Sequence, residues 1–283
     1  MAKILIISGA LRSLQKNLEN IYINLIEPNS IDKVFIDTWD NDGSIGANHK
    51  LGFHNLIFRF LIKLGVNEYK AQDIVNKFGM VKPKYSSSKI DETLIKDTFG
   101  QCDLYINFEK LIYEMPYMLN GYTLNNQIIS EIEHKKNKKY TNSITNFGLN
   151  NMLPMFYKIQ KSAHWVISEI NPSDDDILIR LRPDLFFEET VHINENTNKL
   201  VVFSSHEKPL TNRVPDQFFY GKKNVFLNSC DVFSCLNQII FNLLNQNSKI
   251  IHLGGEHIFS HHLRNKNIIF CQKSLNYFID REN

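Results

Sequence analysis

The sequence predicts an α/β protein with a mostly parallel sheet flanked by helices, and three observations lead to this prediction. The first is KILIIS, a continuous apolar run that ends at Gly9 and is typical of a strand buried on both faces. The second is the helical spacing of apolar residues over 11–28, which Pro28 closes. The third is a second strand-like run, KVFIDTW (33–39). Strand, helix and strand in succession predict a βαβ unit.

The rest of the chain continues this alternation. A long amphipathic helix is predicted over 148–170, because Met155, Ile159, Ala163 and Val166 share one face; Pro154 is expected in its first turn. The other strands are predicted at 104–109, 177–187, 199–205 and 268–272, and the other helices at 232–246 and 256–267. The segment 206–221 is assigned no strand or helix; a loop is expected at Asp216 and Gln217, ahead of a buried aromatic pair.

One domain is expected over 1–283, because the sequence has no internal repeat, low-complexity tract or linker. The region 41–100 does not fit the alternation of strands and helices. Two helix-like stretches, 54–65 and 68–79, precede a polar loop there. We therefore expect a helical insertion at about 41–100.

Composition limits the classes of function. The net charge is +2, from 32 Lys and Arg and 30 Asp and Glu, which gives no field that by itself predicts nucleic-acid or anionic-membrane binding. The four cysteines lack zinc-site spacing and are expected to be reduced thiols. The first apolar run is too short for a secretory signal, and none approaches the ~20 residues of a membrane span. A cytoplasmic protein is expected.

Charged residues end the predicted strand at 177–187. Arg180, Arg182 and Asp184 lie among aliphatic and aromatic residues there. Because ligands of open α/β sheets bind at the carboxyl ends of strands, these side chains are candidates for a binding site. Two guanidinium groups can neutralise a diphosphate, and the carboxylate can hold a divalent cation, Mn²⁺ or Mg²⁺. The alternative is a salt-bridge cluster that closes the sheet edge.

Three further places carry candidate binding residues. Gly9 and Arg12 precede the first helix, whose N-terminus can bind an anion. Asp40 follows the second strand and either contacts a nucleotide ribose or base or caps the next turn. Asp216 and Gln217 precede an aromatic pair, where a carboxylate beside an amide suits sugar hydroxyls or activation of an acceptor hydroxyl. A simple turn is the alternative at Asp216.

Six motifs in order resemble those of glycosyltransferases from bacterial and viral surface-polysaccharide loci, of the lipopolysaccharide or capsule type. They read ISGALRS, VFIDTWD, NMLPMFYKIQKS, ILIRLRPDLFF, VPDQFFYG and GGEHIFSHHL. In that group the corresponding pieces typically read SGQLR, HTWD, NMLSMFYKI, IRxRPDL, SDQFFFG and PExLLxxxL. The resemblance covers most of the chain, except roughly 41–145.

The resemblance implies a GT-A-like, Rossmann-related fold that binds a nucleotide-sugar donor. It places Asp184 near the donor diphosphate, often with Mn²⁺ or Mg²⁺, and Asp216 and Glu256 at the reaction centre. The residues that it implies for donor binding are Arg12, Arg180 and Arg182. Tyr157 and Lys161, four apart on the long helix, either face the donor or form an ordinary aromatic and solvent-facing pair. The sequence departs from the group at Ala10, Asp37 and Gly255, where Gln, His and Pro are usual.

The expected function is transfer of a sugar from a nucleoside diphosphate sugar to a hydroxyl acceptor, with a surface glycan as the leading acceptor. A hydroxylated or glycosylated DNA base is the alternative acceptor, and a non-catalytic nucleotide-sugar-binding protein is a further alternative. An inverting enzyme would use Asp216 or Glu256 as the base. A metal site at His257 and His261 is disfavoured, because the segment lacks HExxH.

Overall fold

The structure is a computed structural model, and it describes most of the chain outside the region between the second and third main strands. The described residues are 1–11, 13–39, 61, 64, 66, 91–110, 113–115, 118–119, 122–137, 146–205, 213–245 and 253–280. Arg12 and Asp40, two predicted donor-binding residues, lie outside them, as does most of the predicted helical insertion at 41–100.

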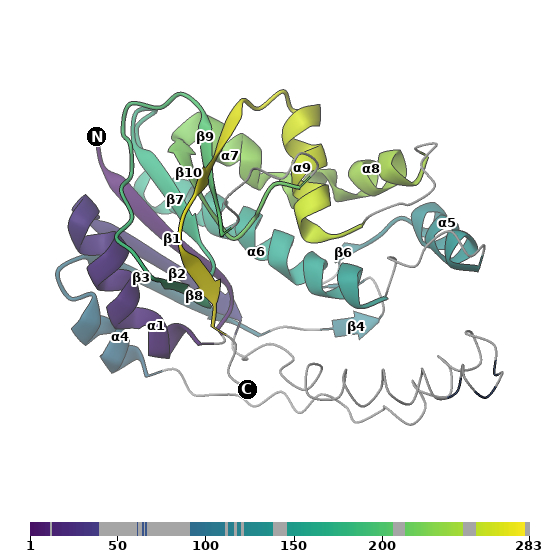
Figure 1. Cartoon of the computed structure of the whole chain (residues 1–283), viewed down its shortest axis with the longest axis horizontal. Coiled ribbons are helices and arrows are strands. Elements are labelled where there is room, and N and C mark those ends of the chain that lie inside the picture. The colour runs from purple at the N-terminus through teal and green to yellow at the C-terminus, as the bar shows by residue number, and fades with distance from the viewer. Residues whose placement is uncertain are drawn as a thin grey trace.

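A mostly parallel sheet forms the centre of the fold (Figure 1). Within the described residues it has seven strands, in the order β11-β9-β10-β7-β1-β2-β3. Their bounds are β1 Lys3–Ala10, β2 Lys33–Trp39, β3 Asp103–Glu109, β7 Ile177–Leu181, β9 Leu200–Ser204, β10 Phe218–Lys222 and β11 Phe270–Ser274. Neighbouring strands are parallel, except that β10 runs antiparallel to both β7 and β9. The α/β class and the mostly parallel sheet are therefore confirmed.

The apolar run of β1 is buried because helices cover both faces of the sheet. Alternate side chains of a strand point to opposite faces; Leu5 and Ile7 belong to one hydrophobic core, and Ile4 and Ile6 to the other. The first core includes residues of α1 Leu14–Ile21 and α4 Glu92–Thr98. The second includes residues of α5 Asn126–Asn137, α6 Asn146–Ile170, α7 Lys223–Cys230, α8 Val232–Leu244 and α9 Gly255–Asn265 (Figure 1).

The first helix has an irregular end. The α-helical turns of α1 continue into a π-helical stretch, η1 Tyr22–Ile26, and a 3-10 turn, η2 Glu27–Asn29. Ser30 then takes a left-handed conformation, with φ of 48°. Pro28 lies in this last turn, so the predicted end of the helix is confirmed.

In the part of the chain that the structure describes, two small sheets accompany the main one. One consists of β4 Tyr113–Met115, β5 Met118–Leu119 and β6 Tyr122–Thr123. The other pairs β8 Leu185–Phe187 with β12 Tyr277–Ile279, which was not predicted. Among the described residues, no helix combines the length and apolar character needed to cross a membrane.

Two sequence predictions are wrong in detail, and one strand was not predicted. The single strand predicted at 177–187 is two strands, because the chain turns after Leu181 and β8 leaves the main sheet. Residues 218–222 form β10, which was not predicted as a strand, and the aromatic pair expected to be buried there lies between β7 and β9. Pro154 lies well inside α6, which begins before the predicted start, at Asn146.

The order of the strands reverses beside β1. From β1 the chain moves through β2 to β3 on one side, and after α6 it returns to β7 on the other side. The carboxyl ends of β1 and β7 thus meet where the strand order reverses, the usual ligand site of open α/β sheets. Four of the predicted site residues, Gly9, Arg180, Arg182 and Asp184, lie at or just after the ends of these two strands.

Candidate functional site

The motif at the end of β1 lies directly against the motif after β7. Gly9 has a φ of +135°, a backbone conformation that residues other than glycine rarely adopt. A Cβ at this position would lie 3.4 Å from Pro183 Cδ. The absence of a side chain at Gly9 therefore permits the end of β1 to lie close to Pro183, which was not predicted from the sequence.

Replacing Gly9 with alanine is expected to lower the free energy of unfolding by about 1–3 kcal/mol. The reason is that alanine, which has a Cβ, would have to adopt the positive φ of this position. Gly221→Ala is the matched control: this strand glycine has no positive φ, and its Cβ would meet atoms no nearer than 3.6 Å. The control is expected to be neutral or slightly stabilising. Urea denaturation of both variants measures the difference, and equal stabilities would contradict the strain at Gly9.

Arg180 is a buried cation at the carboxyl end of β7. Its guanidinium donates to the carbonyl oxygen of Asp216, and it lies 3.4 Å from Ser8 Oγ and 3.3 Å from the Ser8 carbonyl oxygen. Burial lowers the pKa of Arg180 to about 10, although the Asp216 charge opposes this shift. At neutral pH the group therefore remains charged. It holds the ends of β1, β7 and β10 together around one positive charge.

Arg182 and Asp184 form a bidentate ion pair. Arg182 Nε lies 2.6 Å from Asp184 Oδ1, and Nη2 lies 2.8 Å from Oδ2. The Asp184 side chain is fully buried, whereas Arg182 keeps some exposure. A salt bridge at this sheet edge was the stated alternative to a binding site at these residues.

The ion pair bears on the metal predicted at Asp184. Because Arg182 engages both carboxylate oxygens, the pair as arranged here does not fit a metal ligand. Over the described ranges of the chain, no group of three or more His, Cys, Asp or Glu is placed to hold a metal ion. The metal at Asp184 stays a prediction, and no step proposed below uses it.

Asp216 has a buried oxygen without a hydrogen-bond partner. The residue is 4% exposed, and its Oδ2 has no partner among the described residues. A Cβ at Gly255, the first residue of α9, would lie 3.4 Å from this oxygen. Glu256 follows in the first turn of α9, and its carbonyl oxygen accepts from Val214 N at 3.3 Å. A buried, unpartnered carboxylate oxygen costs free energy and is suited to accept a hydrogen bond from a ligand.

Gln217 links the neighbouring segments. Its carbonyl oxygen accepts from Arg182 N at 2.9 Å, and its Oε1 accepts from Tyr277 Oη at 3.2 Å. The structure thus brings together Gly9, Arg180, Arg182, Asp184, Asp216 and Gln217, with Glu256 in the adjoining helix turn. We call these seven residues the switch-point cluster.

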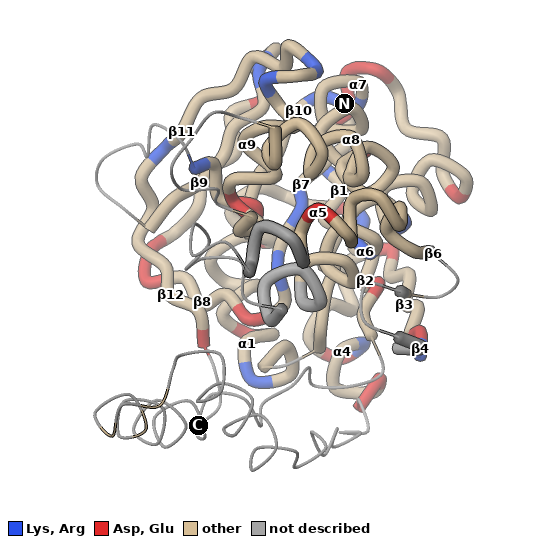
Figure 2. Tube along the Cα trace, turned by 90° about the vertical axis from the view of Figure 1, so that its right-hand side faces the viewer, with Lys and Arg blue, Asp and Glu red and all other residues tan. Residues whose placement is uncertain are grey.

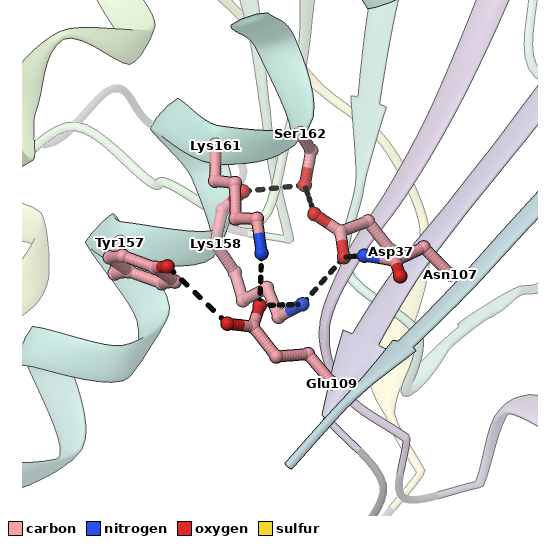
Figure 3. Close-up of polar contacts among 7 residues, drawn as sticks. All are labelled: Asp37, Asn107, Glu109, Tyr157, Lys158, Lys161 and Ser162. Atoms are coloured by element: carbon pink, nitrogen blue, oxygen red, sulfur yellow. Dashed lines mark hydrogen bonds and ion pairs between the residues drawn. The ribbon is translucent and has the colours of Figure 1, made fainter. Parts of the chain in front are cut away.

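Tyr157 and Lys161 belong to a second polar group, which lies between α6 and the strands β2 and β3 (Figure 3). Lys161 Nζ lies 2.5 Å from Glu109 Oε2, and Tyr157 Oη lies 3.4 Å from Glu109 Oε1. Glu109 Oε2 also receives Lys158 Nζ at 2.9 Å, and the same Nζ lies 2.5 Å from Asp37 Oδ1. We call these residues, with Asn107 and Ser162, the α6 network.

Both carboxylate oxygens of Asp37 accept hydrogen bonds within the α6 network. Besides Lys158, its oxygens accept from Ser162 Oγ at 2.9 Å and from Asn107 Nδ2 at 2.8 Å. Asp37 replaces the histidine usual in the resembling group. Its register partner on β1 is Ser8, which also contacts Arg180. The α6 network therefore borders the switch-point cluster on the same face of the sheet.

Charges within the α6 network support one another. Burial alone would raise the pKa of Glu109, but the hydrogen bonds and charges of Lys161 and Lys158 outweigh it and lower that pKa. Burial would lower the pKa of Lys161, and the bond to Glu109 raises it instead. Lys158 Nζ also lies 4.5 Å from the centre of the Trp39 ring. Glu109 and Lys161 therefore both stay ionised at neutral pH.

Lys158 and Glu109 are site-bordering residues that the sequence analysis missed. Lys158 and its partner Asp37 carried a signal: Lys158 lies on the apolar face of α6 between Met155 and Ile159, and Asp37 lies inside an apolar strand. A lysine and an acid that each interrupt an apolar run predict a buried ion pair. The predicted donor contacts of Tyr157 and Lys161 stay predictions, because in the described structure both side chains contact Glu109.

The histidines of α9 make local contacts. His262 Nε2 lies 2.8 Å from the Asn228 carbonyl oxygen, and His261 Nδ1 lies 2.9 Å from Asn265 Nδ2. Both contacts fit packing or capping roles.

Comparison with known proteins adds no assignment: no protein-family model matches the chain, and a search of curated proteins finds no match.

Proposed function

We propose that this chain transfers a sugar from a nucleoside diphosphate sugar to a hydroxyl acceptor, with a surface glycan as the acceptor. The observation that carries the proposal is the buried Arg180 beside the unpartnered Oδ2 of Asp216, at the point where the strand order reverses. A buried cation and a buried, unsatisfied carboxylate are costly to the fold. A ligand that brings negative charge to Arg180 and a hydrogen-bond donor to Asp216 Oδ2 would account for both groups.

In the proposed reaction, the arginines stabilise the leaving group. The bond from the anomeric carbon to the diphosphate oxygen breaks, and negative charge grows on that oxygen. Arg182 contacts Asp184 through Nε and Nη2, and its side chain keeps 15% exposure through which the guanidinium would contact the diphosphate. The ion pair with Asp184 fixes the guanidinium plane, which lowers the entropy cost of binding.

Asp216 is the proposed base for the acceptor. In an inverting reaction, the acceptor hydroxyl would donate to Oδ2, its oxygen would form the bond to the anomeric carbon, and its proton would pass to the carboxylate. Glu256, in the first turn of α9, is the other candidate for this role. The resemblance of the RLRPD and VPDQFFYG motifs to those of surface-polysaccharide glycosyltransferases supports this assignment of roles.

A glycan acceptor is favoured over a DNA base by the distribution of charge. Basic and acidic positions are interspersed along the described chain (Figure 2), and the net charge is +2. Binding to duplex DNA draws its affinity largely from clustered Lys and Arg at phosphates. The basic run at 134–139, considered as a DNA contact, lies partly outside the described residues.

The first test is a thermal-shift screen against nucleoside diphosphate sugars. A donor present at about 100 times its Kd is expected to stabilise the protein by about 2.7 kcal/mol and to raise its melting temperature. Arg182→Lys keeps the charge but loses the bidentate geometry, so we expect the shift to be largely lost. Lys222→Ala is the control, since Lys222 pairs with Asp175 at the opposite end of β7 and β10.

Two results would contradict the donor site. One is the absence of a shift with every nucleotide sugar and with free nucleoside diphosphates. The other is an equal loss of the shift in Lys222→Ala, which would show that any change of surface charge produces it. In the first case the arginines and Asp184 would be a structural ion-pair cluster.

A further inference from the structure

The C-terminal segment after β11 closes one side of the switch-point cluster. Leu275 N donates to the Ser204 carbonyl oxygen at 3.0 Å, and β12 then pairs with β8, which directly follows Asp184. Asp280 N donates to the Asp184 carbonyl oxygen at 2.8 Å. Ser13 Oγ, at the N-terminus of α1, donates to the Asp280 carbonyl oxygen at 2.6 Å. The segment therefore runs from β9 past Asp184 to the start of α1.

Tyr277, in this segment, contacts the cluster through its side chain. It is buried, and its hydroxyl lies 3.2 Å from Gln217 Oε1 and 3.3 Å from the Phe203 carbonyl oxygen. A phenol has one hydrogen to donate, which these two acceptors share. Because Oε1 of Gln217 faces the phenol, the amide nitrogen of Gln217 is directed away from it.

The surroundings keep the Tyr277 phenol protonated. Burial raises its pKa, and the negative charges of Asp216 and Glu256 raise it further. The hydroxyl therefore remains a donor throughout the physiological pH range. The same shift shows that Tyr277 lies within the field of both candidate acids.

We infer that Tyr277 is a positioning residue, which orients the side-chain amide of Gln217 so that its N–H groups face a bound nucleotide sugar. The inference rests on the proposed function. Gln217 is suited to this arrangement because its main chain is already fixed: its carbonyl oxygen accepts from Arg182 N. Only the side-chain torsions remain free, and the phenol fixes them without contacting the ligand itself.

Tyr277→Phe tests this role, because it removes the hydroxyl and keeps the ring. The dissociation constant of the nucleotide sugar that binds the unmodified chain is expected to rise by roughly 3–10-fold, the worth of one neutral hydrogen bond. Tyr220→Phe is the matched control: Tyr220 is also a buried phenol, but its hydroxyl accepts from Asn194 N at 3.0 Å. Its affinity is expected to match that of the unmodified chain.

A double-mutant cycle separates positioning from a general loss of structure. In a Gln217→Ala background, Tyr277→Phe is expected to change the affinity less than about twofold, because no amide remains to be oriented. Independent, additive losses, or an unchanged affinity in Tyr277→Phe, would overturn the inference and leave the proposed function intact. If the unmodified chain binds no nucleotide sugar, the proposed function and the inference fall together.

Discussion

Replacing Lys158 with methionine is expected to lower the free energy of unfolding by about 3–5 kcal/mol, the loss typical when one partner of a buried ion pair is removed. The Lys158 side chain is 0% exposed, and that of Asp37 is 1% exposed. Methionine fills a similar volume but leaves the Asp37 carboxylate buried without its cation. Ser162 and Asn107 would still donate to that carboxylate, but neither neutralises its charge. Urea denaturation measures the loss.

Two comparisons show whether the loss comes from the buried charge. Lys161→Met removes a lysine from the same α6 network, but its side chain is 38% exposed, so we expect a loss below about 1 kcal/mol. The change Asp37→Asn removes the carboxylate charge that Lys158→Met alone would leave uncompensated. The double variant Asp37→Asn with Lys158→Met is therefore expected to recover part of the stability. Equal losses in Lys158→Met and Lys161→Met would contradict the assignment of the cost to burial.

The α6 network explains how polar side chains of α6 can be buried against β2 and β3. Lys158 and Ser162 of α6 contact Asp37 of β2, and Lys158 and Lys161 contact Glu109 of β3. These contacts fix α6 along the carboxyl ends of two strands. Met155, one turn earlier on α6, then reaches the first residue of α9, since a Cβ at Gly255 would lie 3.2 Å from its Cε. The network thus fixes the position of α6, which contacts the start of α9 at Gly255, beside Asp216 Oδ2.

Much of the fold could be predicted from the sequence, because its signals are local. KILIIS and KVFIDTW are apolar for the full length of a strand, and the helix between them has helical spacing and a closing proline. The strand β10 could not be predicted in this way. FFYGK is short and follows a loop-like segment, and its strand conformation depends on β7 and β9 at either side.

The candidate site was partly predictable for a related reason. The charged residues after β7 could be placed at a sheet edge, because a buried strand must end where polar side chains accumulate. Their partners could not be predicted, since Asp216 lies more than thirty residues further along the chain than Arg180. Tyr277 gave no signal at all: an aromatic residue in a short C-terminal strand is typical of any core. Its role depends on which acceptor faces its hydroxyl.

Replacing Asp216 with asparagine is expected to lower the rate of sugar transfer by roughly 10²–10⁴-fold, the usual contribution of a general base. The change keeps the volume of the side chain and removes the charge that would take up the proton. Donor affinity is expected to change little, because the proposed diphosphate contacts come from the arginines. Product formation under saturating donor, with the dissociation constant measured separately, distinguishes these two effects.

Asp175→Asn is the control for Asp216→Asn, since Asp175 is an exposed carboxylate paired with Lys222 at the other end of β7. Its transfer rate is expected to equal that of the unmodified chain. A loss of donor affinity in Asp216→Asn as large as the loss of rate would show that the carboxylate supports Arg180 rather than the acceptor. A retained rate would assign the proton to Glu256. In either case the buried, unpartnered Oδ2 of Asp216 would need another ligand to account for its cost.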